Sequence, residues 1–175
     1  MKTPIYSFLP IGNPEAKILI LGSMPGKASL KANEYYAHPR NVFWRIIASL
    51  GNAAHDLPYA SRVDMLISTK IALWDVLASC TRKSSLDADI VASSITANDF
   101  LSFYSAHPNI AQVFFNGAHA EASYKKHVLP VLDRELEHLK YQRLPSTSPA
   151  HASLSFEQKL QAWRAGFESS TSSSN

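Results

Sequence analysis

The stretch Lys17-Ile18-Leu19-Ile20-Leu21-Gly22 decides the fold class, and Ser23-Met24-Pro25-Gly26 follows it directly as a loop. Four consecutive branched aliphatic residues that end at a glycine indicate a short strand buried on both faces. Such a strand needs apolar cover on each side of its sheet. The stretch therefore predicts a central strand in a sheet that helices cover.

Short apolar runs and amphipathic segments alternate along the rest of the chain. Further strands are predicted at residues 71–74, 110–115 and 141–144, and helices at 41–50, 58–70, 97–106 and 118–128. Ser155, with Gln158 three residues later, forms a capping-box pattern that predicts the start of a closing helix. This alternation favours an α/β fold with a mainly parallel, four-stranded sheet.

Length and composition predict one domain. The chain has 175 residues, of which 46% are hydrophobic and 18% charged, and these proportions suffice for one sizeable core. We expect a single domain over residues 1–168 and a disordered polar tail over 169–175, where serine dominates. A single cysteine, Cys80, excludes an internal disulfide and a cysteine-only iron–sulfur or zinc site.

Net charge and the pattern of apolar segments restrict where the protein is expected to act and which partners it is expected to bind. The net charge of +3 permits contact with nucleic-acid phosphates but does not demand it. The sequence has no apolar run long enough to cross a bilayer and no signal-peptide pattern at its start. We therefore expect a cytoplasmic protein with no membrane partner.

The residues that follow the predicted strands are polar or rich in glycine and proline. They are Gly22 to Gly26, Asp75-Val76, Asn116-Gly117 and Pro145 to Pro149. In parallel sheets ligands bind beyond the carboxyl ends of the strands, so these four segments are expected to form one site. The first loop is not a phosphate-binding loop of the Walker type, because no Gly-Lys-Ser/Thr follows it, and it is no dinucleotide fingerprint; a rigid turn remains its alternative interpretation.

A second informative stretch is Tyr35-Tyr36-Ala37-His38-Pro39-Arg40-Asn41. An aromatic ring beside a loop at the strand ends is what a flipped base needs for stacking, although Tyr36 is equally suited to ordinary packing. Asn41 begins a predicted helix, so an N-cap is its alternative to a chemical role.

Four ordered blocks resemble the uracil-DNA glycosylase superfamily, near the mismatch-specific uracil enzymes and most closely the hypoxanthine-DNA glycosylase branch. The blocks are Gly22 to Gly26 with Tyr36 to Trp44; Leu73 to Leu77 with Cys80, Arg82 and Ser85 to Asp87; Phe115 to Gly117 with Ala120; and Leu144 to Ala150. The resemblance implies a three-layer α/β/α sandwich. It also implies excision of a damaged base without cleavage of the strand.

One departure from the mismatch-uracil pattern locates the expected catalytic residue. In those relatives an asparagine inside the first loop positions the attacking water, and this chain has Met24 there. The hypoxanthine branch instead carries its asparagine in the His-Pro-Arg-Asn segment, which corresponds to Asn41 here. The resemblance therefore assigns the water to Asn41 and favours hypoxanthine as the released base.

The other expected roles follow the same resemblance. Tyr36 stacks on the flipped base, and the loop backbone at Gly22, Ser23 and Met24 bonds its edge. Asn116 reads the 6-oxo and N1 edge, with a turn role before Gly117 as its alternative. His38 and Asp75 are possible supporting residues, and for Asp75 we favour a cap on a short helix from Val76 over support of the water.

A third group of residues is expected to contact DNA phosphates or the minor groove. For His151 an exposed loop position is the alternative. The group consists of Gly26, Ser146, Thr147, Ser148, Ala150 and His151.

The expected partner is double-stranded DNA that contains a deaminated base, and the protein is expected to act as a monomer without cofactor, metal or iron–sulfur cluster. Two rival functions stay open. One is a mismatch-type uracil or thymine glycosylase with the same fold. The other is a non-catalytic binder of damaged DNA or nucleotides, which Met24 favours and Asn41 opposes.

Overall fold

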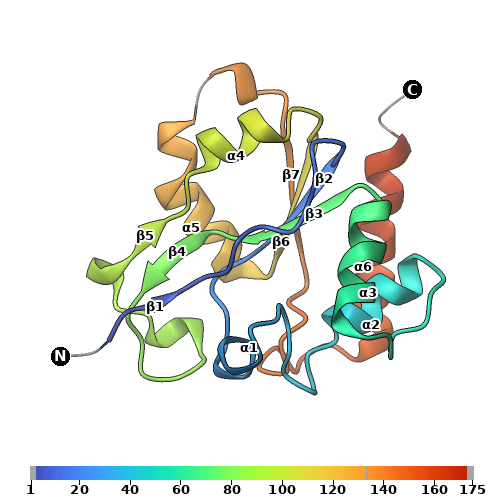
Figure 1. Ribbon diagram of the computed structural model, residues 1–175, viewed down its shortest axis with the longest axis horizontal. Coiled ribbons are helices and arrows are strands. Elements are labelled where there is room, and N and C mark those ends of the chain that lie inside the picture. The colour runs from blue at the N-terminus through green and yellow to red at the C-terminus, as the bar shows by residue number, and fades with distance from the viewer. Residues whose placement is uncertain (1–2, 133, 173–175) are drawn as a thin grey trace.

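The central sheet of the computed structural model has the strand order β3-β2-β6-β7, and every neighbouring pair is parallel (Figure 1). The structure describes residues 3–132 and 134–172. The strands are β2 (Ile18–Gly22), β3 (Ile71–Asp75), β6 (Gln112–Asn116) and β7 (Lys140–Leu144). The predicted parallel four-stranded sheet is confirmed.

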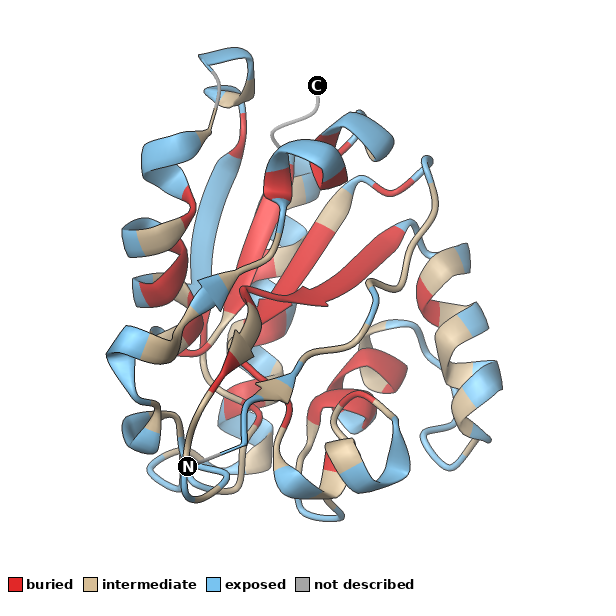
Figure 2. Ribbon diagram, turned by 60° about the vertical axis from the view of Figure 1, so that its left-hand side comes forward, coloured by how far each residue is buried: buried red, intermediate tan, exposed pale blue. Residues whose placement is uncertain are grey.

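Helices cover both faces of this sheet (Figure 1). Leu19 and Leu21 of β2 belong to the core cluster that also holds side chains of α4 (Phe100–Ala106) and α5 (Ala118–His127). Ile20 belongs to the cluster on the opposite face, with side chains of α2 (Phe43–Leu50), α3 (Tyr59–Ser68) and α6 (Phe156–Ser172). This alternation along one strand produces the predicted three-layer sandwich. Figure 2 shows the inner strands as the buried centre of the molecule.

A second, antiparallel sheet of order β1-β4-β5 lies beside the first. Its strands are β1 (Ile5–Tyr6), β4 (Leu77–Cys80) and β5 (Thr96–Ala97). The sequence prediction missed this sheet, and it also placed a short helix from Val76 that does not exist. The chain instead passes from β3 into β4, because Val76 and Leu77 donate backbone hydrogen bonds to the carbonyls of Gly22 and Ser23.

Several predicted helix boundaries shift by a few residues. Helix α4 starts at Phe100 rather than Ala97, because Asp99 caps it by accepting from the Ser102 N–H at 3.1 Å. The capping box at the last helix is confirmed. The Ser155 N–H donates to Gln158 Oε1 at 2.9 Å, and the Gln158 N–H donates to Ser155 Oγ at 3.2 Å.

The polar tail expected from residue 169 is helical as far as Ser172. Its hydroxyl groups donate to carbonyls three or four residues earlier, as Ser170 does to Phe167 at 2.7 Å, and Phe167 packs in the core. The prediction of disorder is therefore wrong for 169–172, while 173–175 lie outside the described residues. Within the described residues no helix is long and apolar enough to span a membrane.

The remaining elements are short. Helix α1 (Lys27–Ala32) follows the first loop, and 3-10 turns occupy Asp87–Asp89, Ala92–Ser94, Leu129–Val131 and Arg134–Leu136. All four parallel strands end at the side of the sheet where α1 lies (Figure 1). The loops after them therefore share one end of the molecule.

Candidate active site

A cavity of about 300 Å³ opens at the carboxyl ends of β2, β3, β6 and β7. This volume is at the lower end for ligand pockets, roughly 300–1,000 Å³. The four loops that the sequence predicted to converge all contribute to its wall. The lining residues used below are Gly22, Ser23, Met24, Gly26, Tyr36, His38, Asn41, Asp75, Asp87, Asn116, Ser146, Thr147, Ser148 and Ala150.

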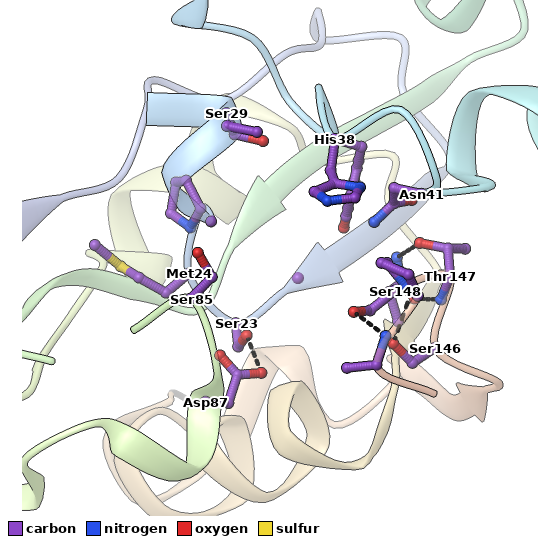
Figure 3. Close-up of a pocket in the computed structure, with 18 of the residues that line it drawn as sticks. Ser23, Met24, Ser29, His38, Asn41, Ser85, Asp87, Ser146, Thr147 and Ser148 are labelled. Carbon is purple, nitrogen blue, oxygen red and sulfur yellow. Dashed lines mark hydrogen bonds between the residues drawn. The ribbon is translucent and has the colours of Figure 1, made fainter. Parts of the chain in front are cut away.

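The first loop is held from outside by the segment that follows β4. Ser23 Oγ donates to Asp87 Oδ2 at 2.7 Å (Figure 3), and the Lys27 N–H donates to Ser85 Oγ at 3.0 Å. The buried guanidinium of Arg82 donates to the Pro25 carbonyl and lies 3.6 Å from Asp87. These bonds fix the loop in place, so its backbone forms a rigid wall of the cavity.

Tyr36 stands in the cavity wall with an unusual backbone conformation. Its φ is +54°, which is uncommon for a residue with a side chain and is stabilised by local packing. The ring stacks on Phe43, with centroids 4.2 Å apart. The hydroxyl is buried and makes no hydrogen bond of standard geometry with a described residue, but the Asn116 side chain is near enough to oppose the rise of its pKa. Burial, followed by the charge of Asp75, raises the pKa of Tyr36, so this hydroxyl stays protonated.

Asp75 ends β3 with its carboxyl group in the cavity wall, and the residue is only 3% exposed. Its Oδ2 accepts from Ser7 Oγ at 2.7 Å, and its backbone carbonyl accepts from Asn98 Nδ2 at 2.8 Å. Burial raises the pKa of Asp75 to about 7, while Ser7 and Arg82 oppose the rise and Asp87 adds to it. The predicted helix-cap role is wrong, since the carboxylate bonds a residue of the N-terminal segment.

Asn41 lies on the cavity wall between His38 and the loop that contains Ser146 to Ser148 (Figure 3). Its Oδ1 accepts from the Phe43 N–H at 2.9 Å, the kind of bond expected near a helix start. A side-chain carbonyl has two lone pairs, so this bond leaves one for a water molecule. The N-cap interpretation of Asn41 is wrong, because Val42 is the N-cap of α2 and no side chain caps this helix.

Asn116 and Thr147 join the ends of β6 and β7. Asn116 Nδ2 donates to Thr147 Oγ1 at 2.9 Å, and the Thr147 N–H donates to Asn116 Oδ1 at 2.9 Å. Thr147 is 1% exposed, and its carbonyl accepts from the Val42 N–H at 3.1 Å. The Thr147 hydroxyl thus braces the loop, in place of the phosphate contact that the sequence suggested.

The remainder of the last loop is folded on itself. The Ser148 N–H donates to Ser146 Oγ at 3.2 Å, and the Ala150 N–H donates to Ser148 Oγ at 3.2 Å (Figure 3). His151 does not line the main cavity; it lies in an adjoining one with Gly117 and Arg143. Of the site residues predicted from sequence, all except His151 therefore line the same cavity.

A comparison with protein families decides where this chain belongs. Residues 9–167 match the model of the uracil DNA glycosylase superfamily, which is most of the chain. This chain belongs to the uracil-DNA glycosylase superfamily. The resemblance inferred from the four sequence blocks is confirmed, as is the DNA glycosylase class that it implied.

Two individual members of this superfamily are similar to this chain in sequence. The chain is 38% identical to a hypoxanthine DNA glycosylase of Methanosarcina barkeri (strain Fusaro / DSM 804) over 111 residues, which are 63% of this chain and 69% of that protein. It is 35% identical to a hypoxanthine DNA glycosylase of Methanosarcina acetivorans over 59% of this chain and 65% of that protein.

A solved structure supports the same assignment. The solution NMR structure of a Methanosarcina acetivorans protein described as a uracil DNA glycosylase aligns with a TM-score of 0.77 at 30% identity. The alignment covers 94% of this chain and 97% of that one. The superfamily fold thus extends over nearly the whole molecule.

Sequence reasoning gave no role to Asp87, Arg82 or Ser85, although they lie in the second matching block. Their contacts with the first loop span 57 to 64 positions of sequence, and a short polar segment carries no periodicity that predicts such pairing. Ser7 was missed for the same reason, with 68 positions between it and Asp75. Among the described residues no group of three metal-binding side chains occurs.

Proposed function

We propose that this superfamily member is a monofunctional DNA glycosylase that removes hypoxanthine from deoxyinosine in double-stranded DNA. The proposal rests on the identity of two residues that line the cavity, Asn41 and, in the first loop, Met24. Met24 has no group that orients a water, whereas the Asn41 amide does. The names of the two Methanosarcina relatives support the same substrate.

Excision breaks the bond between C1′ of deoxyribose and N9 of the base. The electron pair of that bond leaves with the base, positive charge develops on the sugar, and the oxygen of water forms the new bond at C1′. The proton that this water loses ends on the released base, so the products are neutral hypoxanthine and an abasic sugar with a hydroxyl at C1′. Asn41 holds this water through the free lone pair of Oδ1. The 6-oxo group stabilises the hypoxanthine anion, so the site works mainly by positioning and by favouring departure of the base.

Base flipping supplies the substrate to the cavity. Tyr36 stacks on the extruded base with the ring face that Phe43 leaves free. The backbone of Gly22, Ser23 and Met24 borders the base, and Asn116, which braces Thr147, retains one amide hydrogen for it. His38 supports Asn41 from the same segment, because the Asn41 N–H donates to the His38 carbonyl at 2.9 Å.

Phosphates of the damaged strand contact the rim of the cavity. Ser146, Ser148 and the exposed Ala150 offer hydroxyl and backbone groups there, with Gly26 opposite them. His151 lies farther out, toward the minor groove. The protein acts as a monomer on cytoplasmic DNA and needs no cofactor.

The test is a panel of labelled duplexes that each contain one deoxyinosine, deoxyxanthosine, deoxyuridine or mismatched thymidine. We expect wild-type protein to create an alkali-labile site at deoxyinosine fastest and to leave the strand intact until alkali is added. Faster release of uracil or thymine would replace the proposal with the mismatch-type function. Binding without any release would favour the non-catalytic binder.

A further inference from the structure

Helix α6 carries a buried lysine that lies directly behind the loop after β7. Lys159 is only 5% exposed, although lysine is almost never fully buried without a charged partner. Its ammonium nitrogen donates to the Ser148 carbonyl at 3.3 Å. Ser148 lines the main cavity and Lys159 lines neither cavity, so the loop separates this lysine from the opening.

The charge of Lys159 is not neutralised by the described part of the chain. No described residue forms an ion pair with its ammonium group. The one hydrogen-bond acceptor that it has among these residues is the Ser148 carbonyl, which also accepts from the His151 N–H at 3.0 Å. An ammonium group has three hydrogens, so this single bond leaves two of them for another partner.

Burial makes the unpaired charge unfavourable in the free protein. Desolvation lowers the pKa of Lys159, because its surroundings favour the neutral amine over the ammonium ion. A buried charge is tolerated when an opposite charge or further hydrogen bonds compensate its lost hydration. The position of Lys159 is therefore suited to an anion that arrives on the outer side of the loop.

The loop in front of Lys159 has no strong charge of its own. From Pro145 to Ser155 the sequence contains no lysine, arginine, aspartate or glutamate, and His151 is its one titratable side chain. The hydroxyl and backbone groups of this loop carry no net charge, whereas lysine and arginine supply most of the affinity of proteins for a phosphate backbone. Lys159 thus places a positive charge directly against an otherwise neutral surface.

We propose that Lys159 is a positioning residue for DNA, whose buried ammonium group holds the turn at Ser148 and attracts a backbone phosphate of the damaged strand to the outer face of this loop. Lys159 does not touch the phosphate. It acts through Ser148 and through its electric field, which is screened less by buried atoms than by water. This inference rests on the contact between the loop and phosphates in the proposed function, and it adds the source of their positive charge.

The charge of Lys159 and its packing can be changed separately. Lys159→Met keeps an unbranched side chain of similar length and removes the charge, whereas Lys159→Arg keeps the charge and enlarges the side chain. Lys159→Gln is a second neutral variant. The matched control is Lys17→Met, which removes the same charge at an exposed position just before β2, at the end of the sheet opposite to the cavity.

The experiment measures the affinity of each protein for an undamaged duplex over a series of salt concentrations. The slope of log affinity against log salt concentration reports how many phosphates a protein neutralises. Thermal unfolding identifies variants that fail to fold. Single-turnover excision at a saturating concentration of a deoxyinosine duplex measures the chemical step separately.

We expect Lys159→Met to bind the duplex about fivefold or more weakly at low salt, with the magnitude of the slope reduced by about 1. Its melting temperature should be at least that of wild type, because the variant no longer buries an unpaired charge. Lys159→Arg should keep the wild-type slope, and so should Lys17→Met. The rate of excision at saturating duplex should stay close to wild type in all of these variants, since Lys159 lies outside the cavity.

Two results would overturn the inference. One is a wild-type slope in a folded Lys159→Met variant, or in Lys159→Gln if the methionine variant fails to fold. The other is an equal reduction of the slope in Lys17→Met, because the net charge of the protein would then explain the effect. Failure of the proposed function is a separate outcome: wild-type protein would release no hypoxanthine, while the slopes on undamaged duplex would still differ.

Discussion

Burial keeps Asp75 protonated to a pH well above the ordinary range of an aspartate, and this has a consequence for stability. The folded protein raises the pKa of Asp75 from 3.8 to about 7, mainly by desolvation. The native state therefore binds a proton that the unfolded chain has already lost between these two values. The free energy of unfolding therefore falls as the pH rises from about 4 to about 7, and above pH 7 Asp75 causes no further decrease.

Replacement of Asp75 by asparagine removes this penalty. The free energy of unfolding of Asp75→Asn, relative to wild type, should rise between pH 4.5 and pH 8 by about 3 kcal/mol, the part of the shift that falls in this interval. Urea unfolding at both pH values measures it. Asp64→Asn, at an exposed position of α3, is the matched control and should show no such difference. If Asp75→Asn changed the free energy of unfolding by the same amount at both pH values, the raised pKa of Asp75 would be contradicted.

At the scale of elements, the cavity depends on bonds between loops that belong to different strands. The Asn116–Thr147 pair ties the end of β6 to the loop after β7, and the Thr147 carbonyl holds Val42 at the start of α2. Since Asn41 directly precedes Val42, this brace helps to set the position of Asn41, the proposed catalytic residue. The brace thus aligns β6, the loop after β7 and the start of α2 around one cavity.

Thr147→Val tests the brace. The change keeps the shape of the buried side chain but leaves Asn116 Nδ2 without its acceptor, which should cost about 1–2 kcal/mol of stability. The rate of hypoxanthine release should also fall, because Asn41 shifts with the loop. Thr69→Val removes a hydroxyl bond to the Leu66 carbonyl far along the chain, at the end of α3, and should leave the rate unchanged. Equal rates in both variants would show that the brace does not position Asn41.

Elements with their own periodicity were predictable from sequence, and elements defined by distant partners were not. The apolar runs of β2, β3 and β6 predict a covered parallel sheet, and the structure has it. Strands β1 and β5 have two residues each, too short for any alternation to register, so the antiparallel sheet was missed. The helix expected after Asp75 was wrong because the backbone there pairs with the first loop.

At the scale of the whole molecule, parallel topology explains why a site was predictable at all. Strands that all run the same way place their following loops at one end, so residues from four distant segments were expected together and line one cavity. The finer arrangement depends on side-chain partners tens of residues apart, such as Ser7 with Asp75 and Ser23 with Asp87. Those pairings leave no local pattern in the sequence.

The same topology brings the proposed base-binding residues and the proposed catalytic residue to one cavity. Gly22, Tyr36 and Asp75 meet at one point of the cavity wall. Asn41 lines the same cavity beside the loop at Ser148 (Figure 3). In the proposed function Asn41 positions the water that attacks the sugar. Loss of Asn41 should therefore impair the chemical step while substrate DNA still binds.

The most direct measurement is single-turnover release of hypoxanthine from a deoxyinosine duplex by wild-type protein and Asn41→Ala, with duplex affinity measured in parallel. We expect rapid release by wild type and a loss of roughly 100-fold or more in the variant, at nearly unchanged affinity, the size of effect expected for one positioned catalytic group. Equal rates of release by the two proteins would contradict it.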